Sequence, residues 1–281
     1  MCMRSIIIFI SVLILAGCDQ TQPVSFSPKG KLFIIGGGDR TPLLMNELKR
    51  VAQLTAGSTI AVLPMAGEEP DSSFFYFQKD IPVSWKVKCL NLNFSDTLAD
   101  IALLKAQLQK AQTVFICGGD QKRFMDVVER YGLASIIKDI YLKGATIAGT
   151  SAGAAVMSEK MITGDQTSDT AYSATYSTIQ PDNGIYANGL GFITKGIVDQ
   201  HFIVRSRYNR LFSAQLDFPQ LWAMGIDEST AAVFHNDSVE VVGHSYVVYF
   251  SPIEQASKDA VPHLTSTTTF YRPGEKFRLA P

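Results

Sequence analysis

The sequence predicts an α/β protein built on a mostly parallel β-sheet that helices cover on both faces, giving three layers. Short runs of continuous apolar residues alternate along the chain with segments in which apolar residues recur at helical spacing. Parallel strands are buried on both faces, so they appear as continuous apolar runs rather than as alternating ones. With 281 residues, 46% of them apolar, the chain can bury a sizeable core.

The first half of the chain carries most of this pattern. Strands are predicted at residues 31–35, 59–64, 83–90, 113–117 and 145–149. Helices are predicted at residues 41–54, 97–110, 120–131 and 133–142, the second of them capped by Asp96. Glycines at 36–38 and 118–119 follow two of the strands, as expected where a buried strand ends in a tight turn.

The second half is less regular. After residue 163 a stretch rich in serine, threonine and tyrosine extends to residue 188. Beyond it we predict a strand at 196–199, a helix at 205–216 and short strands at 232–234, 239–242 and 247–250. We interpret this part as an extension of the same sheet by edge hairpins, and the sequence contains no internal repeat.

The N-terminal residues have the pattern of an export signal. Arg4 precedes an apolar stretch at residues 6–16, which is too short to span a bilayer but fits a signal peptide. The stretch ends in Leu15-Ala-Gly-Cys18 and resembles the cleavage box of bacterial lipoproteins. That resemblance implies a signal peptide at 1–17 and a lipid on Cys18. An ordinary signal peptide with an incidental cysteine is the alternative.

This organisation leaves three segments and predicts where the protein resides. Residues 18–30 are polar with two prolines, so they form a flexible tether, and residues 31–281 form the folded domain. The expected protein is exported and lipid-anchored to a cell membrane, facing the periplasm or the exterior. The sequence leaves open which membrane carries it, and also the oligomeric state, a homodimer included.

Several functional classes are disfavoured. A formal net charge of −1 gives no electrostatic basis for binding nucleic acid. The glycines at 36–38 lack the spacing of a dinucleotide site and the lysine of a P-loop, and no metal-ligand spacing occurs, so we predict no cofactor and no metal. Cys89 and Cys117 end strand-like runs and are predicted to be buried free thiols, a disulfide being the alternative.

The candidate nucleophile is Ser151, in the sequence Gly149-Thr-Ser-Ala-Gly153. This is the G-x-S-x-G pattern, and it lies where an apolar strand turns into a helix, as the motif requires. The backbone N–H of Ala152 is then placed to stabilise a developing oxyanion. A glycine-rich turn without catalysis is the alternative.

A serine hydroxyl needs a base, and the chain has four histidines. His201 follows a predicted strand, and the carboxyl ends of strands form the ligand crevice of open parallel sheets, so His201 and Ser151 can meet. The other three, which are placed in hairpin-like segments, are His235, His244 and His263.

These residues resemble the cyanophycinases of peptidase family S51. The resemblance covers roughly residues 31–279 and depends on the following segments: Gly149-Thr-Ser-Ala-Gly-Ala154, Asp199-Gln-His-Phe202, Arg205-x-Arg207-x-x-Arg210, Phe115-x-x-Gly-Gly-Asp-Gln121, Gly225-Ile-Asp-Glu228 and Pro273-Gly-Glu-Lys-Phe277. It implies a three-layer α/β sandwich related to class I glutamine amidotransferases, in agreement with the predicted strands and helices.

The resemblance also implies roles for individual residues. Ser151 would be the nucleophile and His201 its general base, with the N–H groups of Gly119 and Ala152 forming the oxyanion hole. Gln121 would line the substrate site, unless it only caps the helix that starts there. Arginine side chains are suited to bind substrate carboxylates, and three follow the histidine closely: Arg205, Arg207 and Arg210.

The third, orienting acid is the least defined member of the site. The family places it between the serine and the histidine and often uses glutamate, but this chain has no glutamate between Glu159 and Glu228. We therefore predict Asp169, with Asp165 as the second choice. Glu228 and its neighbour Asp227 match the family as well, with a structural role as the alternative.

The resemblance implies a serine hydrolase that cleaves aspartyl peptide bonds, most directly cyanophycin into β-aspartyl-arginine dipeptides. An aspartyl or isoaspartyl dipeptidase on the same fold is the first alternative. A non-catalytic lipoprotein that binds acidic peptides is the second. The third is an unrelated α/β-hydrolase esterase, which would use His263 as its base.

Overall fold

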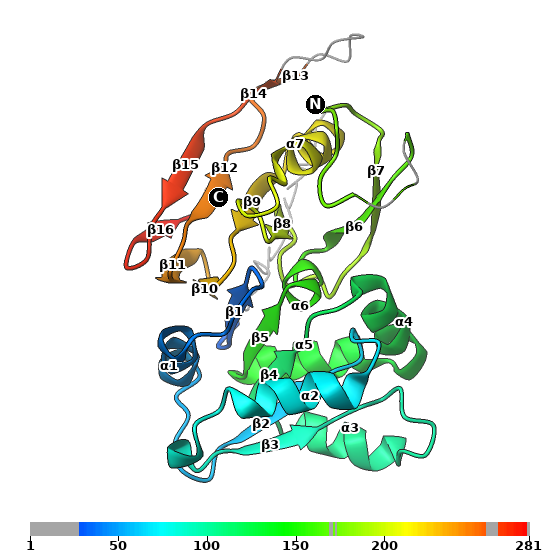
Figure 1. The fold of residues 1–281 in the computed structure, drawn as a ribbon, viewed down its shortest axis with the longest axis vertical. Coiled ribbons are helices and arrows are strands. Elements are labelled where there is room, and N and C mark those ends of the chain that lie inside the picture. Colours follow the sequence, from blue (N-terminus) through cyan, green and yellow to red (C-terminus); the bar gives the residue numbers. More distant parts are fainter. Residues whose placement is uncertain (1–27, 169–170, 172, 257–263, 280–281) are drawn as a thin grey trace, which may run out of the picture.

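The computed structural model describes residues 28–168, 171, 173–256 and 264–279, and it has a parallel sheet at its centre (Figure 1). The parallel strands are β1 (Lys31–Ile35), β2 (Thr59–Leu63), β3 (Lys88–Asn91), β4 (Thr113–Ile116) and β5 (Thr146–Thr150). They are ordered β1-β5-β4-β2-β3. The mostly parallel sheet predicted from the continuous apolar runs is confirmed.

Three antiparallel strands continue this sheet beyond β1. They are β10 (Thr230–His235), β11 (Ser238–Gly243) and β16 (Lys276–Arg278). β10 pairs with β1, β11 with β10 and β16 with β11, which gives a sheet of eight strands. To this extent the C-terminal part extends the first sheet, as predicted.

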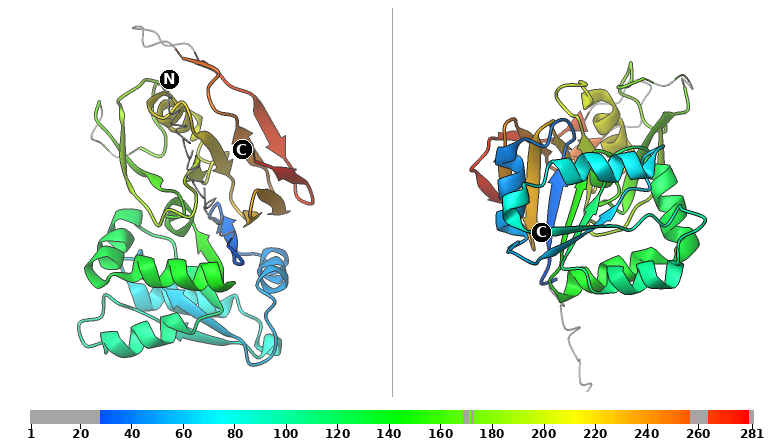
Figure 2. Two further views of the ribbon diagram at one scale, coloured as in Figure 1. Left: turned by 180° about the vertical axis from the view of Figure 1, so that it is seen from behind. Right: turned by 60° about the horizontal axis from the view of Figure 1, so that its bottom comes forward.

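Helices cover both faces of the large sheet (Figure 2). Side chains alternate along β1, so that Phe33 and Ile35 pack with α1 (Pro42–Val51) and α2 (Pro70–Lys79). Leu32 and Ile34 belong to the core on the opposite face. That face is covered by α3 (Ile101–Gln109), α4 (Gln121–Tyr131) and α5 (Leu133–Lys143). The three layers follow from burial of both sheet faces.

A second sheet, which the sequence analysis did not separate from the first, lies above the carboxyl ends of the parallel strands (Figure 1). It contains β8 (Gly196–Gln200), β9 (Trp222–Ile226), β12 (Val247–Phe250) and β15 (Thr268–Tyr271). Helix α7 (Tyr208–Asp217) packs on it through a separate apolar cluster. The prediction of a single extended sheet is therefore wrong for these four strands, because apolar runs do not reveal which sheet a strand joins.

Other boundaries also differ from prediction. The expected strand at 83–90 is a short 3₁₀ helix, η1 (Val83–Trp85), followed by β3. Helix α3 starts later than predicted, because Asp100 rather than Asp96 accepts the N–H bond at its start. The polar stretch after residue 163 contains part of a hairpin of β6 (Lys160–Gln166) and β7 (Gly184–Asn188). Two short strands, β13 (Gln255–Ala256) and β14 (Leu264–Thr265), pair near the C-terminus.

The predicted signal peptide, Cys18 and most of the tether lie outside the described residues, and the predictions made for them stay predictions. Within the part of the chain that is described, no helix combines the length and the apolar character needed to cross a membrane.

Candidate active site

Ser151 lies on a sharp turn between strand β5 and the short helix α6 (Ala152–Ala155). Its φ of 54° and ψ of −111° are uncommon for a residue with a side chain. A Cβ atom at Gly149 would lie 2.3 Å from the carbonyl oxygen of Gly153, and one at Gly153 would lie 2.4 Å from that of Ile116. Both glycines of the motif are therefore required by close packing, which lets the turn present the serine hydroxyl.

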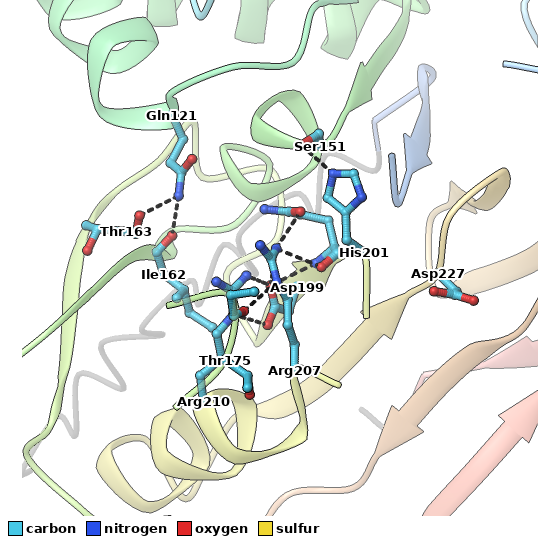
Figure 3. Close-up of polar contacts among 12 residues, drawn as sticks. Gln121, Ser151, Ile162, Thr163, Thr175, Asp199, His201, Arg207, Arg210 and Asp227 are labelled. Carbon is cyan, nitrogen blue, oxygen red and sulfur yellow. Dashed lines mark hydrogen bonds and ion pairs between the residues drawn. The ribbon is translucent and has the colours of Figure 1, made fainter. Parts of the chain in front are cut away.

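The Ser151 hydroxyl contacts His201, which the second sheet brings to it (Figure 3). Ser151 Oγ lies 2.9 Å from His201 Nε2, and the other ring nitrogen, Nδ1, lies 2.5 Å from Glu228 Oε1. The histidine comes directly after β8 and the glutamate after β9, two parallel neighbours of the second sheet. A continuous chain of hydrogen bonds thus runs from Glu228 through the imidazole to Ser151.

The surroundings of His201 keep its imidazole neutral. Its side chain is buried, and burial lowers the pKa of His201 below its ordinary value of 6.5. The hydrogen bond with Glu228 acts in the opposite direction, whereas the positive charges of Arg205 and Arg207 lower the pKa further. A neutral imidazole can accept a proton, which is what a general base requires.

The turn after β1 connects all three of these residues through its backbone. The carbonyl of Ile35 accepts from the N–H of Ser151 at 3.1 Å, and that of Gly36 accepts from the N–H of His201 at 2.6 Å. The carbonyl of Gly37 accepts from the N–H of Ser229, next to Glu228, at 2.8 Å. Three consecutive carbonyls therefore fix the relative positions of segments from both sheets.

Of the two predicted aspartates, only Asp165 lies among the described residues, and it does not contact His201. Asp165 forms an ion pair with Lys122, 2.6 Å apart, and Asp169 lies outside the described residues. Glu228 occupies the Nδ1 side of the histidine instead. Its neighbour Asp227 does have a structural role, since one carboxylate oxygen accepts the N–H groups of Ile203 and Val204 just after His201.

A cavity of about 210 Å³ lies beside Ser151 and is basic on balance, because four basic residues and two aspartates, Asp120 and Asp165, line it. Its lining contains Gln121, Lys122 and the three predicted arginines, Arg205, Arg207 and Arg210. Lys122 is already paired with Asp165. Among the described residues no hydrogen bond or ion pair involves the half-buried guanidinium of Arg205, so this group is available to a ligand.

The other two arginines are engaged with the protein (Figure 3). Arg210 binds the buried carboxylate of Asp199 through both Nε and Nη2. Arg207 donates from Nη1 to the backbone carbonyl and the side-chain oxygen of Gln200, at 2.9 and 2.6 Å. Both residues therefore fix the strand end that precedes His201, which sequence reasoning did not anticipate.

The predicted oxyanion-hole donors and Gln121 lie at the same sheet edge. In the described part of the chain, neither the Gly119 nor the Ala152 backbone N–H has a hydrogen-bond acceptor. The Gln121 side chain donates from Nε2 to the carbonyls of Ile162 and Thr163, at 3.0 and 2.7 Å. Helix α4 is capped by Asp120, so Gln121 anchors β6 rather than capping the helix.

The remaining candidates are inert. Cys89 and Cys117 are free, as predicted, although Cys89 is only half-buried. Burial raises the pKa of Cys89 to about 11 and that of Cys117 to about 12, so neither forms a thiolate readily. His235 and His244 are exposed, and His263 lies outside the described residues. In the same described ranges, no cluster of histidine, cysteine and carboxylate side chains could hold a metal ion.

Comparison with known proteins gives relatives over most of the chain. A family model for peptidase family S51 matches residues 32–242. The cyanophycinase of Nostoc sp. (strain PCC 7120 / SAG 25.82 / UTEX 2576) is 33% identical over 236 residues, 80% of this chain and 75% of that protein. The cyanophycinase of Geminocystis herdmanii (strain PCC 6308) is 32% identical over 227 residues, 78% of this chain and 79% of that protein.

Solved structures agree on the fold. A peptidase from an acI-B1 Actinobacterium superposes with a TM-score of 0.66 at 20% identity, covering 90% of this chain and 98% of that one. A putative peptidase E from Listeria monocytogenes EGD-e superposes with a TM-score of 0.57 at 16% identity, covering 77% and 99%. Such neighbours have a glutamine-amidotransferase-like fold, as predicted.

A serine on a strained turn, bonded to a histidine that a carboxylate holds, is the arrangement of a serine hydrolase. The fold and the relatives narrow this class to a serine peptidase. The chain belongs to peptidase family S51.

Gly37 offers a direct test of how tightly the imidazole must be held. A Cβ atom at this position would lie 2.2 Å from His201 Cε1 and 2.4 Å from Nε2, so Gly37→Ala must displace the ring. We expect kcat/KM to fall about 100-fold, because a misplacement of about 1 Å has this effect on catalysis. The measurement is kcat/KM for peptide hydrolysis, calculated for the folded fraction of the protein. Thermal unfolding gives that fraction.

The matched control is Gly57→Ala. Gly57 also has a positive φ, of 89°, but nothing lies within 4 Å of its added Cβ. This variant carries the same kind of backbone strain without touching the histidine, and its folded fraction should keep wild-type kcat/KM. Equal activity losses in the two variants would show that the contact with His201 is irrelevant.

Proposed function

We propose that this protein hydrolyses aspartyl peptide bonds, with cyanophycin as the leading substrate, through a triad of Ser151, His201 and Glu228. The observation that carries the proposal is the unbroken chain of hydrogen bonds from Glu228 Oε1 to Ser151 Oγ. The cyanophycinases among the relatives support the choice of substrate. The triad replaces the sequence-based assignment of Asp169 by Glu228.

In the first half of the reaction, Ser151 becomes the nucleophile. A carboxylate only accepts hydrogen bonds, so the Nδ1 proton of His201 is bonded to Glu228 and the Nε2 lone pair faces the serine hydroxyl. As Ser151 Oγ attacks the scissile carbonyl carbon, its proton passes to Nε2. Glu228 stabilises the resulting imidazolium, and the carbonyl oxygen becomes an oxyanion.

The free N–H groups of Gly119 and Ala152 are the proposed donors to that oxyanion. They follow strands β4 and β5, which are neighbours in the sheet, and the described chain leaves both without an acceptor. The tetrahedral intermediate then collapses. The C–N bond breaks, and Nε2 returns its proton to the leaving amine, which gives an acyl-enzyme ester on Ser151.

In the second half a water molecule takes the place of the amine. His201 accepts one proton from the water, whose oxygen attacks the ester carbonyl. Collapse of the second intermediate breaks the bond to Ser151 Oγ, and the serine regains its proton from Nε2. The acyl product leaves as a free carboxylate, and the site returns to its starting state.

Arg205 is the proposed ligand of the substrate carboxylate on the acyl side of the bond, which is the aspartate side chain in a simple aspartyl peptide and the free carboxylate of the attached arginine in cyanophycin. Its guanidinium lines the basic cavity beside Ser151 and has no partner in the described chain, whereas Arg207 and Arg210 are held by protein groups. A forked guanidinium suits a carboxylate. On this proposal the enzyme prefers substrates with a carboxylate at this position over neutral ones.

A substrate panel tests the function. The protein comprising residues 19–281 would be incubated with cyanophycin and with α- and β-aspartyl dipeptides. The Ser151→Ala variant is the control for contaminating peptidases, and the products would be identified by mass spectrometry. Release of β-aspartyl-arginine from the polymer supports the proposal. Cleavage of dipeptides alone would identify an aspartyl or isoaspartyl dipeptidase. Peptide binding without any product would identify a non-catalytic binding protein.

Arg205→Ala should weaken substrate binding. We expect KM for aspartyl substrates to rise about 10-fold to 100-fold, the loss of one charge-assisted hydrogen bond, while kcat changes less. Removing this charge also raises the pKa of His201, so the acidic limb of the kcat profile should move to higher pH. The measurement is steady-state kinetics across pH.

Lys122→Ala is the matched control for this prediction. Lys122 lines the same cavity, but its ammonium is already paired with Asp165, so the effect on KM should be small. If Lys122→Ala raised KM as much as Arg205→Ala, the cavity would act through its total positive charge rather than through one arginine.

The location of the enzyme is a separate proposal. The pattern at residues 1–18 supports export and attachment of lipid to Cys18, and residues 18–30 then tether the peptidase to the membrane surface. An anchored enzyme of this kind meets peptides from the periplasm or the exterior rather than an intracellular store.

A further inference from the structure

A second cavity, of about 280 Å³, also reaches Ser151, which is the one residue that it shares with the lining of the basic cavity. It is lined by the turn after β1, by α2 residues Ser73 and Tyr76, and by His201. His201 does not line the basic cavity that contains Arg205. Because His201 gives the proton to the leaving amine, the leaving part of the peptide has to be on the side that His201 lines.

The charge of this second cavity comes from Arg40. No carboxylate is among the side chains that line it, and Arg40 is its only permanently charged one. Arg40 donates from Nε to Asp80 at 2.6 Å, and its guanidinium lies 6.0 Å from the centre of the Phe115 ring. No further hydrogen bond of Arg40 occurs within the described residues, so the Nη groups of an oriented guanidinium remain available.

We propose that Arg40, held by Asp80, is the residue that binds the free α-carboxylate of the leaving residue. The inference rests on the proposed function. In a C-terminal residue the carboxylate is only one carbon away from the leaving nitrogen, so both fit one small cavity. The volume lies near the lower limit for ligand pockets, about 300 Å³, which gives room for a short leaving group.

The test compares two peptides that differ only at this carboxylate: acetyl-Asp-Ala with a free C-terminus, and its C-terminal amide. For the wild-type enzyme we expect kcat/KM to favour the free acid by about 10-fold to 100-fold, the size of one charge-assisted hydrogen bond. In Arg40→Gln this ratio should fall to about 1, with cleavage of the amide little changed.

Arg40→Lys should give an intermediate ratio, because an ammonium keeps the charge without the forked geometry. It also serves if Arg40→Gln does not fold. Arg130→Gln is the matched control, since Arg130 is an exposed arginine of α4 that does not line this cavity. Its ratio should equal that of the wild type. A wild-type ratio of about 1, or a ratio unchanged in Arg40→Gln, overturns the inference.

A binding measurement separates this inference from the proposed function. Calorimetry with Ser151→Ala, with and without Arg40→Gln, measures the same acid-to-amide preference without turnover. If the wild type hydrolyses neither peptide but Ser151→Ala still prefers the free acid through Arg40, the carboxylate site stands and the proposed hydrolysis fails. If hydrolysis occurs but binding shows no preference that depends on Arg40, the carboxylate site fails alone.

Discussion

Ser151→Ala is expected to lower kcat for aspartyl peptides by about 10⁴-fold to 10⁶-fold, the range seen when the nucleophile of a serine peptidase is removed. The reason is that no other group can form the acyl-enzyme. Cys117 is buried, with its pKa raised to about 12, so it cannot replace the serine. The fold should survive, since a methyl group on the same turn disturbs no packing.

The measurement is single-turnover hydrolysis with mass spectrometry of any acylated protein. Ser135→Ala is the control, because Ser135 is an exposed serine on α5 whose hydroxyl bonds only to a carbonyl of its own chain segment, that of Gly132. It should keep wild-type kcat. Turnover by Ser151→Ala within 10-fold of the wild type would contradict the assignment of the nucleophile.

Glu228→Gln is expected to lower kcat by up to about 10⁴-fold while leaving the size of the side chain unchanged. A glutamine amide can donate to Nδ1 of His201, which places the ring proton on Nε2 and removes the lone pair that must accept the serine proton. The measurement is kcat/KM for an aspartyl peptide as a function of pH.

The pH profile gives this variant a second signature. Activity requires neutral His201 and is lost as the pH falls through its pKa. Since Glu228 raises that pKa, its removal should move the acidic limb to lower pH, further below the ordinary value of 6.5. A merely structural role for Glu228 would lower the rate without this displacement.

Two aspartate variants complete the comparison. Asp165→Asn breaks only the exposed ion pair with Lys122, and kcat should stay within a few-fold of the wild type. Asp169→Asn tests the position that the sequence favoured. If Asp169→Asn lost activity as Glu228→Gln should, with the same change in pH dependence, the triad would have to include Asp169 after all.

The parts of the fold that continuous apolar runs define were predictable. Strands β1, β2, β4 and β5 start and end within two residues of prediction, because each is buried on both faces. Helix α2 was missed for two reasons. Its N-terminus has no side-chain cap, and the helix exposes Phe75 and Tyr76 instead of showing a clear apolar stripe. The second sheet was missed because strand pairing is not encoded in a strand's own residues.

The site was predictable where a motif fixes local geometry. The G-x-S-x-G pattern identified Ser151. The position of His201 after a predicted strand, at the same sheet edge, identified it as the partner, and the two side chains are in contact. The third acid that we propose, Glu228, depended on how β8 and β9 pair, which only the fold reveals. One signal was present in the sequence: Glu228 is the first glutamate after Glu159, and it lies two residues beyond the end of β9, at the sheet edge where side chains meet.

The glycine turn at the end of β1 has a consequence for when activity can arise. Its carbonyls accept hydrogen bonds from the N–H groups of Ser151, His201 and Ser229. Ser229 lies almost two hundred residues later in the chain. Ser151, His201 and Glu228 therefore cannot be aligned until the segment that contains Ser229 has been synthesised and has folded. A chain whose C-terminal part has not yet folded onto this turn is therefore expected to be inactive.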